Sequence, residues 1–252
     1  MANQICKVAF ISGANRGLGF ETARELGEAG VHVVIGARDQ ASGDKAAAEL
    51  RSKGFQVDAF KIDVTSPADQ RALCEFLDRT YGRLDILVNN AGMILEDNVP
   101  NAGPHNTVLQ VSTDTVRQTF ETNFFGTFEL TRTLLPLLEK SPAARIVNVS
   151  SILGSLTVHS DPGQPAVYDY KSFAYGTSKT LVNSFTVYLA HALKHTSIKV
   201  NSAHPGWVKT KLGGSIAPLE LSEGGKTSAQ LSLLDESGPS GGFFHLGEKV
   251  PW

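Results

Sequence analysis

A glycine-rich turn near the start of the chain most constrains what this sequence can fold into. The turn, residues 12–19 (SGANRGLG), follows an apolar run with β-branched residues, 5–12, and precedes an amphipathic stretch, 17–29. The run is typical of a strand buried on both faces, and the stretch predicts a helix. This order aims free backbone N–H groups at a diphosphate, and glycines let the backbone approach it closely.

The spacing of these glycines is Gly-x-x-x-Gly-x-Gly, which differs from the Gly-x-Gly-x-x-Gly dinucleotide fingerprint. The alternative interpretation is a plain βα turn whose glycines serve helix packing. Three glycines at a strand-to-helix junction favour the nucleotide site. The residues of the turn expected to contact a nucleotide are Gly13, Asn15, Arg16, Gly17, Leu18 and Gly19.

Strand and helix signals alternate along the rest of the chain. Ser66, Pro67 and Asp69 match an N-cap serine, a first-turn proline and an acid near the positive helix end. Strands are expected at residues 31–36, 55–62, 84–89, 145–149, 198–203 and 241–244, and helices at 41–53, 67–81, 113–138 and 172–195. This order predicts an α/β fold, a doubly wound parallel sheet of the Rossmann type with helices on both faces.

The length of 252 residues is enough for one substantial core, so we expect a single domain over residues 1–252. No internal repeat or linker interrupts the pattern. The segments 93–111 and 206–223 are long for connections in a compact domain, so we expect them to shape the site.

Net charge and apolar runs exclude several classes of partner. The net charge is −2 and there is no basic run, which argues against nucleic acid or an anionic membrane. No apolar stretch approaches the ~18 residues of a membrane span. Residues 1–10 lead straight into the first strand and leave no room for a signal peptide, so we expect a cytoplasmic location.

Cysteines and histidines do not indicate a metal site or a disulfide framework. Cys6 and Cys74 fall in a predicted strand and a predicted helix, where two isolated cysteines are best interpreted as reduced core thiols. His191 and His195 share a helix face, but no glutamate follows His191, so the zinc-protease pattern is absent. We therefore expect no metal.

Tyr175 and Lys179 carry the strongest chemical signal. Four residues apart on a predicted helix, they lie on one face, about one turn from each other. A free phenol has a pKa near ~10, and a nearby ammonium lowers it, so the pair is a candidate proton donor. Alone, such a pair is more often an ordinary surface pair; the nucleotide turn upstream favours catalysis.

The end of the second predicted strand bears on cofactor choice. A carboxylate there usually binds the ribose hydroxyls of NAD, whereas a cation accommodates the 2′-phosphate of NADP. Arg38 is that cation, and Arg16 in the glycine turn is a second one. A guanidinium binds phosphate through paired hydrogen bonds. Asp39 could be the NAD-type acid, but it lies one position late, and a solvated loop charge is the alternative for Arg38.

With these motifs in order, the chain resembles the short-chain dehydrogenase/reductase family, and within it the NADPH-dependent carbonyl reductases. The resemblance covers essentially the whole chain. It matches further cofactor positions to Asp63, Val64, Asn90, Ala91, Gly92, Tyr175, Lys179, Pro205, Gly206, Val208 and Thr210, and catalytic positions to Ser151, Tyr175, Lys179 and Asn123.

The resemblance implies an NADPH-dependent reduction of ketones or aldehydes to alcohols. In that reaction Tyr175 gives a proton to the carbonyl oxygen as hydride reaches carbon, and Ser151 donates a hydrogen bond to that oxygen. Lys179 lowers the phenol pKa and binds the nicotinamide ribose, and Asn123 holds a water that relays protons through Lys179. Taken alone, Ser151 would be a turn serine and Asn123 a polar helix residue.

Ser151 and Tyr175 are twenty-four residues apart, further than in compact members of the family. The intervening segment 154–172 contains prolines and glycines typical of a surface loop beside the catalytic helix. Because that helix commonly pairs subunits in the family, we expect a monomer or a weak homodimer rather than a tetramer. Candidates for an apolar wall that selects aryl or alkyl carbonyls are Leu153, Val158, Tyr168, Trp207 and Leu212, with ordinary core or loop roles as the alternative.

Two other functions stay open. A 3-oxoacyl-carrier or thioester reductase would need a basic docking surface, and this chain is not basic overall. A non-catalytic NADPH-sensing protein could use the same fold. Such a protein would usually lose Tyr175, Lys179 or Ser151, and all three are present.

Overall fold

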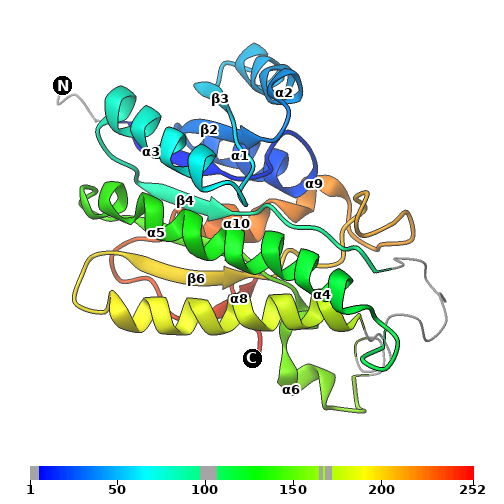
Figure 1. Ribbon diagram of the computed structural model, residues 1–252. Coiled ribbons are helices and arrows are strands. Elements are labelled where there is room, and N and C mark those ends of the chain that lie inside the picture. The colour runs from blue at the N-terminus through cyan, green and yellow to red at the C-terminus, as the bar shows by residue number, and fades with distance from the viewer. Residues whose placement is uncertain (1–5, 97–106, 165–166, 168–171) are drawn as a thin grey trace.

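An eight-stranded sheet forms the centre of the protein, with the strand order β3-β2-β1-β4-β5-β6-β7-β8 (Figure 1). The computed structural model describes residues 6–96, 107–164, 167 and 172–252. Neighbouring strands are parallel except β7 and β8. The strands are β1 Val8–Ile11, β2 His32–Ala37, β3 Val57–Lys61, β4 Ile86–Asn89, β5 Arg145–Val149, β6 Lys199–Ala203, β7 Phe243–His245 and β8 Glu248–Lys249. The predicted fold class is confirmed, with one antiparallel strand added at the edge.

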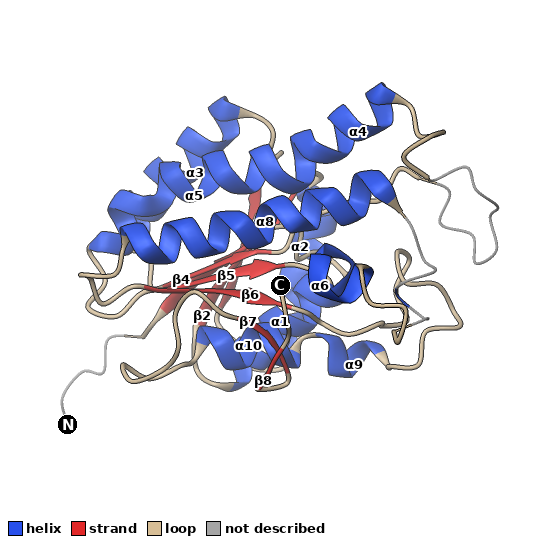
Figure 2. Cartoon of the chain, turned by 90° about the horizontal axis from the view of Figure 1, so that it is seen from below, coloured by secondary structure: helices blue, strands red, loops and turns tan. Residues whose placement is uncertain are grey.

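Helices cover both faces of the sheet (Figure 2). One layer holds α1 (Gly17–Glu28), α2 (Gln40–Ser52) and α10 (Lys226–Ser232), and the other holds α3 (Pro67–Tyr81), α5 (Gly126–Glu139) and α8 (Phe173–Ala192). The shorter elements are α4 Thr113–Phe120, η2 Glu121–Phe125, η3 Ile152–Gly154, α6 Leu156–His159 and α9 Leu221–Gly224. In the described part of the chain, no helix combines the length and apolar character needed to cross a membrane.

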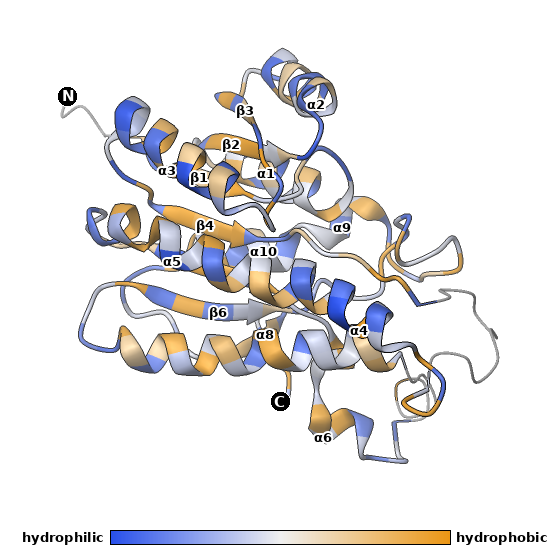
Figure 3. Cartoon of the chain, viewed as in Figure 1, coloured by the Kyte–Doolittle hydropathy of each residue, from blue (hydrophilic) through white to orange (hydrophobic). Residues whose placement is uncertain are grey.

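Alternation along the strands builds the two halves of the core. In β1, Ala9 and Ile11 pack with the α1 layer, whereas Val8 and Phe10 pack with the α3 layer. Successive side chains of a strand point to opposite faces, so a strand buried on both sides is mostly apolar. In Figure 3, β2 and β4 are largely orange, whereas β6 also carries blue and pale residues.

The predicted start of α3 is confirmed by its capping contacts. The Ser66 side chain accepts a hydrogen bond from the backbone N–H of Asp69 at 3.2 Å, and Pro67 opens the helix. Gly82, with φ of 74°, ends it in the left-handed conformation. Glycine adopts this conformation without steric cost, so both ends of the helix follow from local sequence.

One predicted helix is interrupted in the structure, and the elements α6, α9, α10 and β8 were not predicted. The expected continuous helix 113–138 is interrupted by the π-helical turn η2, in which the buried side chain of Asn123 binds elsewhere in the fold. The chain also forms β8, which the sequence analysis missed. Leu246 and Gly247 make the turn before it with φ of 49° and 87°, and a leucine with positive φ is a poor turn signal.

The order of the strands locates the functional site. The chain runs outward from β1 to β3 and then returns to pair β4 with β1, so the direction of winding reverses between β1 and β4. In open α/β sheets, ligands bind in the crevice outside the carboxyl ends of the strands at such a reversal. The segments after β4 and β6 extend to this end of the sheet (Figure 1).

Candidate active site

A cavity of about 1020 Å³ lies at the carboxyl end of the sheet. It is lined by segments from all along the chain, including the glycine turn, the segment after β4 and the helix α8. The predicted site residues that line it are Gly13, Asn15, Arg16, Gly17, Leu18, Arg38, Asp63, Val64, Asn90, Ala91, Gly92, Tyr175, Lys179, Pro205, Thr210 and Leu212.

The glycine turn is fixed by the segment after β4. The side-chain amide of Asn90 donates to the carbonyl oxygens of Ser12 at 2.8 Å and Gly13 at 3.1 Å. The Ser12 hydroxyl in turn accepts from the backbone N–H groups of Asn90 and Ala91, both at 3.0 Å. Gly13 has φ of 64°, and a Cβ there would lie 3.1 Å from the Ala91 Cα. A glycine is needed here because the two backbones approach so closely.

Three predicted cofactor contacts do not line the cavity, namely Gly19, Gly206 and Val208. A Cβ on Gly19 would lie 2.5 Å from the Asn90 amide nitrogen, so this glycine lets α1 pack against the turn. Gly206 has φ of 87°, and a Cβ there would lie 2.4 Å from the Leu219 side chain. Val208 is buried and its backbone pairs with Leu219. All three residues thus pack against neighbouring segments outside the cavity lining.

Arg38 and Asp39, the two residues after β2, make different contacts. Arg38 lines the cavity, as does Arg16 at the start of α1. The Asp39 carboxylate instead accepts from the Ser42 backbone N–H at 2.8 Å and caps α2. Two arginines therefore line the cavity, while the neighbouring acid is used within a helix cap.

Tyr175 and Lys179 lie on α8 at the cavity wall, and both are nearly buried. The Lys179 Nζ lies 5.7 Å from the centre of the Tyr175 ring and donates to the Val149 carbonyl oxygen at 2.8 Å. Burial disfavours the charged form and lowers the pKa of Lys179 to about 8. The Tyr175 phenol and the Lys179 side chain thus lie at the same wall of the cavity.

The serine loop packs directly on this helix. A Cβ on Gly154 would lie 2.7 Å from the Lys179 carbonyl carbon, so only glycine permits the contact. Ser151 precedes η3, and its Oγ accepts from the Leu153 backbone N–H at 3.2 Å. Ser150 lines the cavity and Ser151 is half-buried beside it, outside the cavity lining. The fold brings Ser151 to the catalytic helix without placing it on the wall itself.

Asn123 lies behind the cavity and is fully buried. Its Oδ1 accepts from the Met93 backbone N–H at 2.8 Å, and its Nδ2 donates to the Met93 carbonyl oxygen at 2.9 Å and to the Ser178 Oγ at 3.0 Å. The side chain therefore fixes the segment after β4 against α8. The expected water relay through Asn123 stays a prediction.

The expected apolar wall is only partly assembled at this cavity. Leu212 lines it, whereas Leu153, Val158 and Trp207 do not, and Tyr168 lies outside the described residues. The Trp207 side chain is about half exposed, and its indole N–H donates to the Gly213 carbonyl oxygen at 2.7 Å. That bond ties Trp207 to its own loop.

The segments 93–111 and 206–223 were expected to shape the site, but no motif singled out several of the residues that line the cavity. Glu96, Thr122, Lys209, Lys211 and Ser215 all border the cavity. Each lies in a connecting segment or an irregular turn, where neither periodicity nor a spaced motif marks a side chain as inward-facing. Glu96 is the most unusual of them because a carboxylate is rarely buried unless it is paired.

Comparison with known proteins assigns the family. The family model for short chain dehydrogenases matches residues 7–220. Short-chain dehydrogenase/reductase 1 of Saponaria officinalis is 31% identical, over 98% of this chain and 96% of its own length. Carbonyl reductase [NADPH] 1 of Mus musculus is 31% identical, over 97% and 98% respectively. The solved structure of the carbonyl reductase Sniffer of D. melanogaster superposes with a TM-score of 0.81 at 29% identity, covering 98% of this chain and all of that one (100%). The chain therefore belongs to the short-chain dehydrogenase family.

Proposed function

We propose that the protein reduces ketones or aldehydes to alcohols with NADPH. The observation that carries the proposal is the placement of Tyr175 and Lys179 on the wall of the cavity that the glycine turn also lines. The similarity to a carbonyl reductase named for NADPH supports the same substrate class and cofactor.

The residues around the cavity fit NADPH. The glycine turn offers N–H groups at the start of α1, which has neither a capping side-chain bond nor an acid in its first turn, so the positive helix end stays available for an anion. Arg16 and Arg38 would hold the 2′-phosphate, and Asp63 and Val64 would flank the adenine. When bound, NADPH supplies the hydride for carbonyl reduction.

The protein's own groups supply the proton and the stabilisation of charge. Tyr175 transfers its phenolic proton to the carbonyl oxygen, which leaves a phenolate on the tyrosine and a hydroxyl on the product. The Lys179 ammonium, held beside the ring, stabilises that phenolate. Ser151 lies beside the wall rather than on it, and its hydroxyl, which accepts from the Leu153 N–H, would donate its hydrogen to the same oxygen as negative charge develops.

A turnover screen tests the proposal. The purified protein is assayed with NADPH and with NADH against aryl ketones, aldehydes and a 3-oxoacyl thioester. We expect turnover of ketones or aldehydes with NADPH preferred. Preferred reduction of the thioester would move the assignment to a carrier reductase, and cofactor binding without turnover of any carbonyl would favour the sensing protein.

We also propose that the protein is a monomer or a weak homodimer in the cytoplasm. The insertion after Ser151 forms α6 beside the catalytic helix, and the Thr157 backbone N–H in it donates to the Trp252 carbonyl oxygen at 2.8 Å. A standard interface buries about 1,600 Å², so an insertion at its centre would disrupt the packing. Sedimentation at micromolar concentration checks this, and a stable tetramer would contradict it.

A further inference from the structure

A buried carboxylate from the segment after β4 contacts the start of the catalytic helix. Glu96 is only 6% exposed and borders the cavity. Its two oxygens accept three hydrogen bonds, from the backbone N–H of Ala174 at 2.7 Å, the backbone N–H of Tyr175 at 2.8 Å and the Ser172 hydroxyl at 2.5 Å. The mechanism above does not use this group.

These contacts replace the usual cap of α8. The first four N–H groups of a helix have no partner within the helix, and an N-cap serine normally accepts from one of them. Ser172 occupies the N-cap position, but its side chain makes no such bond and donates to Glu96 instead. The carboxylate also complements the positive end of the helix. Glu96 is thus the capping group of the helix that carries the proton donor.

The segment that carries Glu96 is fixed by Asn123. Three residues before Glu96, the backbone of Met93 is bound at both its N–H and its carbonyl oxygen by Asn123. Asn123 also binds Ser178 on α8. The segment 93–96 therefore connects the end of β4, the π-helical turn and the first turn of α8.

We propose that Glu96 is a positioning residue for proton transfer, because it fixes the backbone of Tyr175 and so the direction of the phenol. This inference rests on the proposed function. Tyr175 lies in the first turn of α8, where an uncapped helix frays, whereas Lys179 lies a full turn deeper. Loss of the cap should therefore disturb the proton donor more than the lysine.

Substitutions of Glu96 give graded expectations. Glu96→Ala removes all three acceptor contacts, and kcat should fall at least about tenfold, towards the ~10²-fold that a misplacement of about 1 Å costs. Glu96→Gln keeps the length and one oxygen but turns an amide NH2 towards backbone donors. Its kcat should therefore lie between those of Glu96→Ala and the unmodified protein. The Kd of NADPH should change by no more than about twofold, since only the reacting end is displaced.

A double-mutant cycle with Tyr175→Phe separates positioning from general loss of structure. If Glu96 acts through the phenol, Glu96→Ala should reduce kcat much less in the Tyr175→Phe protein than in the unmodified one. Ser66→Ala, which removes the cap of α3, is the matched control and should leave kcat unchanged. Hydrogen exchange should accelerate at residues 172–176 in Glu96→Ala alone.

The possible results are distinct. An equal loss of kcat in both backgrounds, or faster exchange with kcat unchanged, would overturn the positioning role of Glu96. Unchanged exchange at the start of α8 would overturn the cap itself. Failure of the unmodified protein to reduce any carbonyl with NADPH would reject the proposed function, and the role of Glu96 in that reaction with it.

Discussion

At the scale of single residues, two neighbours in the sequence have different structural roles. Arg38 borders the cavity, while Asp39 caps α2 through the Ser42 N–H. Asp39 was expected to lie one position too late to bind the ribose. Its carboxylate is instead engaged in the cap of α2. A carboxylate engaged by a backbone N–H at a helix start is already stabilised there.

Arg38→Ala should weaken NADPH more than NADH. The loss of a hydrogen bond to a charged phosphate costs roughly 1.5–3 kcal/mol, or about tenfold or more in affinity. NADH lacks the 2′-phosphate and should lose little. Fluorescence titration of both cofactors measures the ratio, and equal weakening would show that Arg38 does not read the phosphate.

Lys179 should make the stability of the free protein rise with pH. Burial lowers its pKa from 10.5 to about 8. Between these values the unfolded chain binds the proton and the folded one does not, so the free energy of unfolding increases through this window, by about 3 kcal/mol in total. Lys179→Met should remove that part of the rise in denaturant unfolding at pH 7 to 10; the same slope in both proteins would contradict it.

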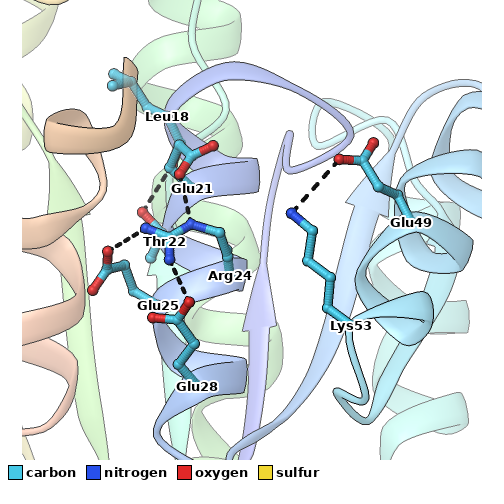
Figure 4. Close-up of polar contacts among 8 residues, drawn as sticks. All are labelled: Leu18, Glu21, Thr22, Arg24, Glu25, Glu28, Glu49 and Lys53. Atoms are coloured by element: carbon cyan, nitrogen blue, oxygen red, sulfur yellow. Dashed lines mark hydrogen bonds and ion pairs between the residues drawn. The ribbon is translucent and has the colours of Figure 1, made fainter. Parts of the chain in front are cut away.

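At the scale of elements, a buried arginine and a half-buried arginine contribute differently to stability. Arg145, at the start of β5, is buried and donates to the backbone carbonyl oxygens of Ala143, Ala144, Ser197, Leu234 and Asp235. It joins the start of the strand to the chain after α10. Arg24 on α1 instead pairs with Glu21, Glu25 and Glu28 on a helix surface (Figure 4).

Arg145→Met should therefore destabilise the protein by about 3 kcal/mol or more, because several buried carbonyl groups lose their partner. Arg24→Ala is the control and should cost about 1 kcal/mol or less, since its ion pairs join neighbouring turns of one surface helix and no buried backbone carbonyl loses a partner. Urea unfolding compares the two. A similar loss for both variants would mean that Arg145 is not the link that its contacts indicate.

Elements with a local signal could be predicted, and those that depend on distant contacts could not. The Ser66 cap and the apolar strands are determined by a few neighbouring residues. The π-helical turn holds Asn123, whose side chain binds Met93, thirty residues earlier in the chain. The turn at Leu246 and Gly247 carries no common turn pair, so β8 has no signal either.

At the scale of the whole molecule, the topology assembles the site from segments far apart in the sequence. Motifs with fixed spacing, such as Tyr175 with Lys179, could be placed because a helix sets their geometry. Glu96 could not, because its role depends on how the segment after β4 lies against α8. Ser151 shows the same limit. Its motif could be recognised in the sequence, but its position outside the cavity lining could not be predicted.

The central claim is that Tyr175 gives the proton in an NADPH-dependent reduction. Steady-state reduction of an aryl ketone by Tyr175→Phe tests it most directly, because the ring stays and only the transferable proton is lost. We predict that kcat falls by at least ~10²-fold, the usual scale for general acid catalysis, while the Kd of NADPH is largely retained. A variant that keeps most of its turnover would contradict the claim and assign the proton to another group.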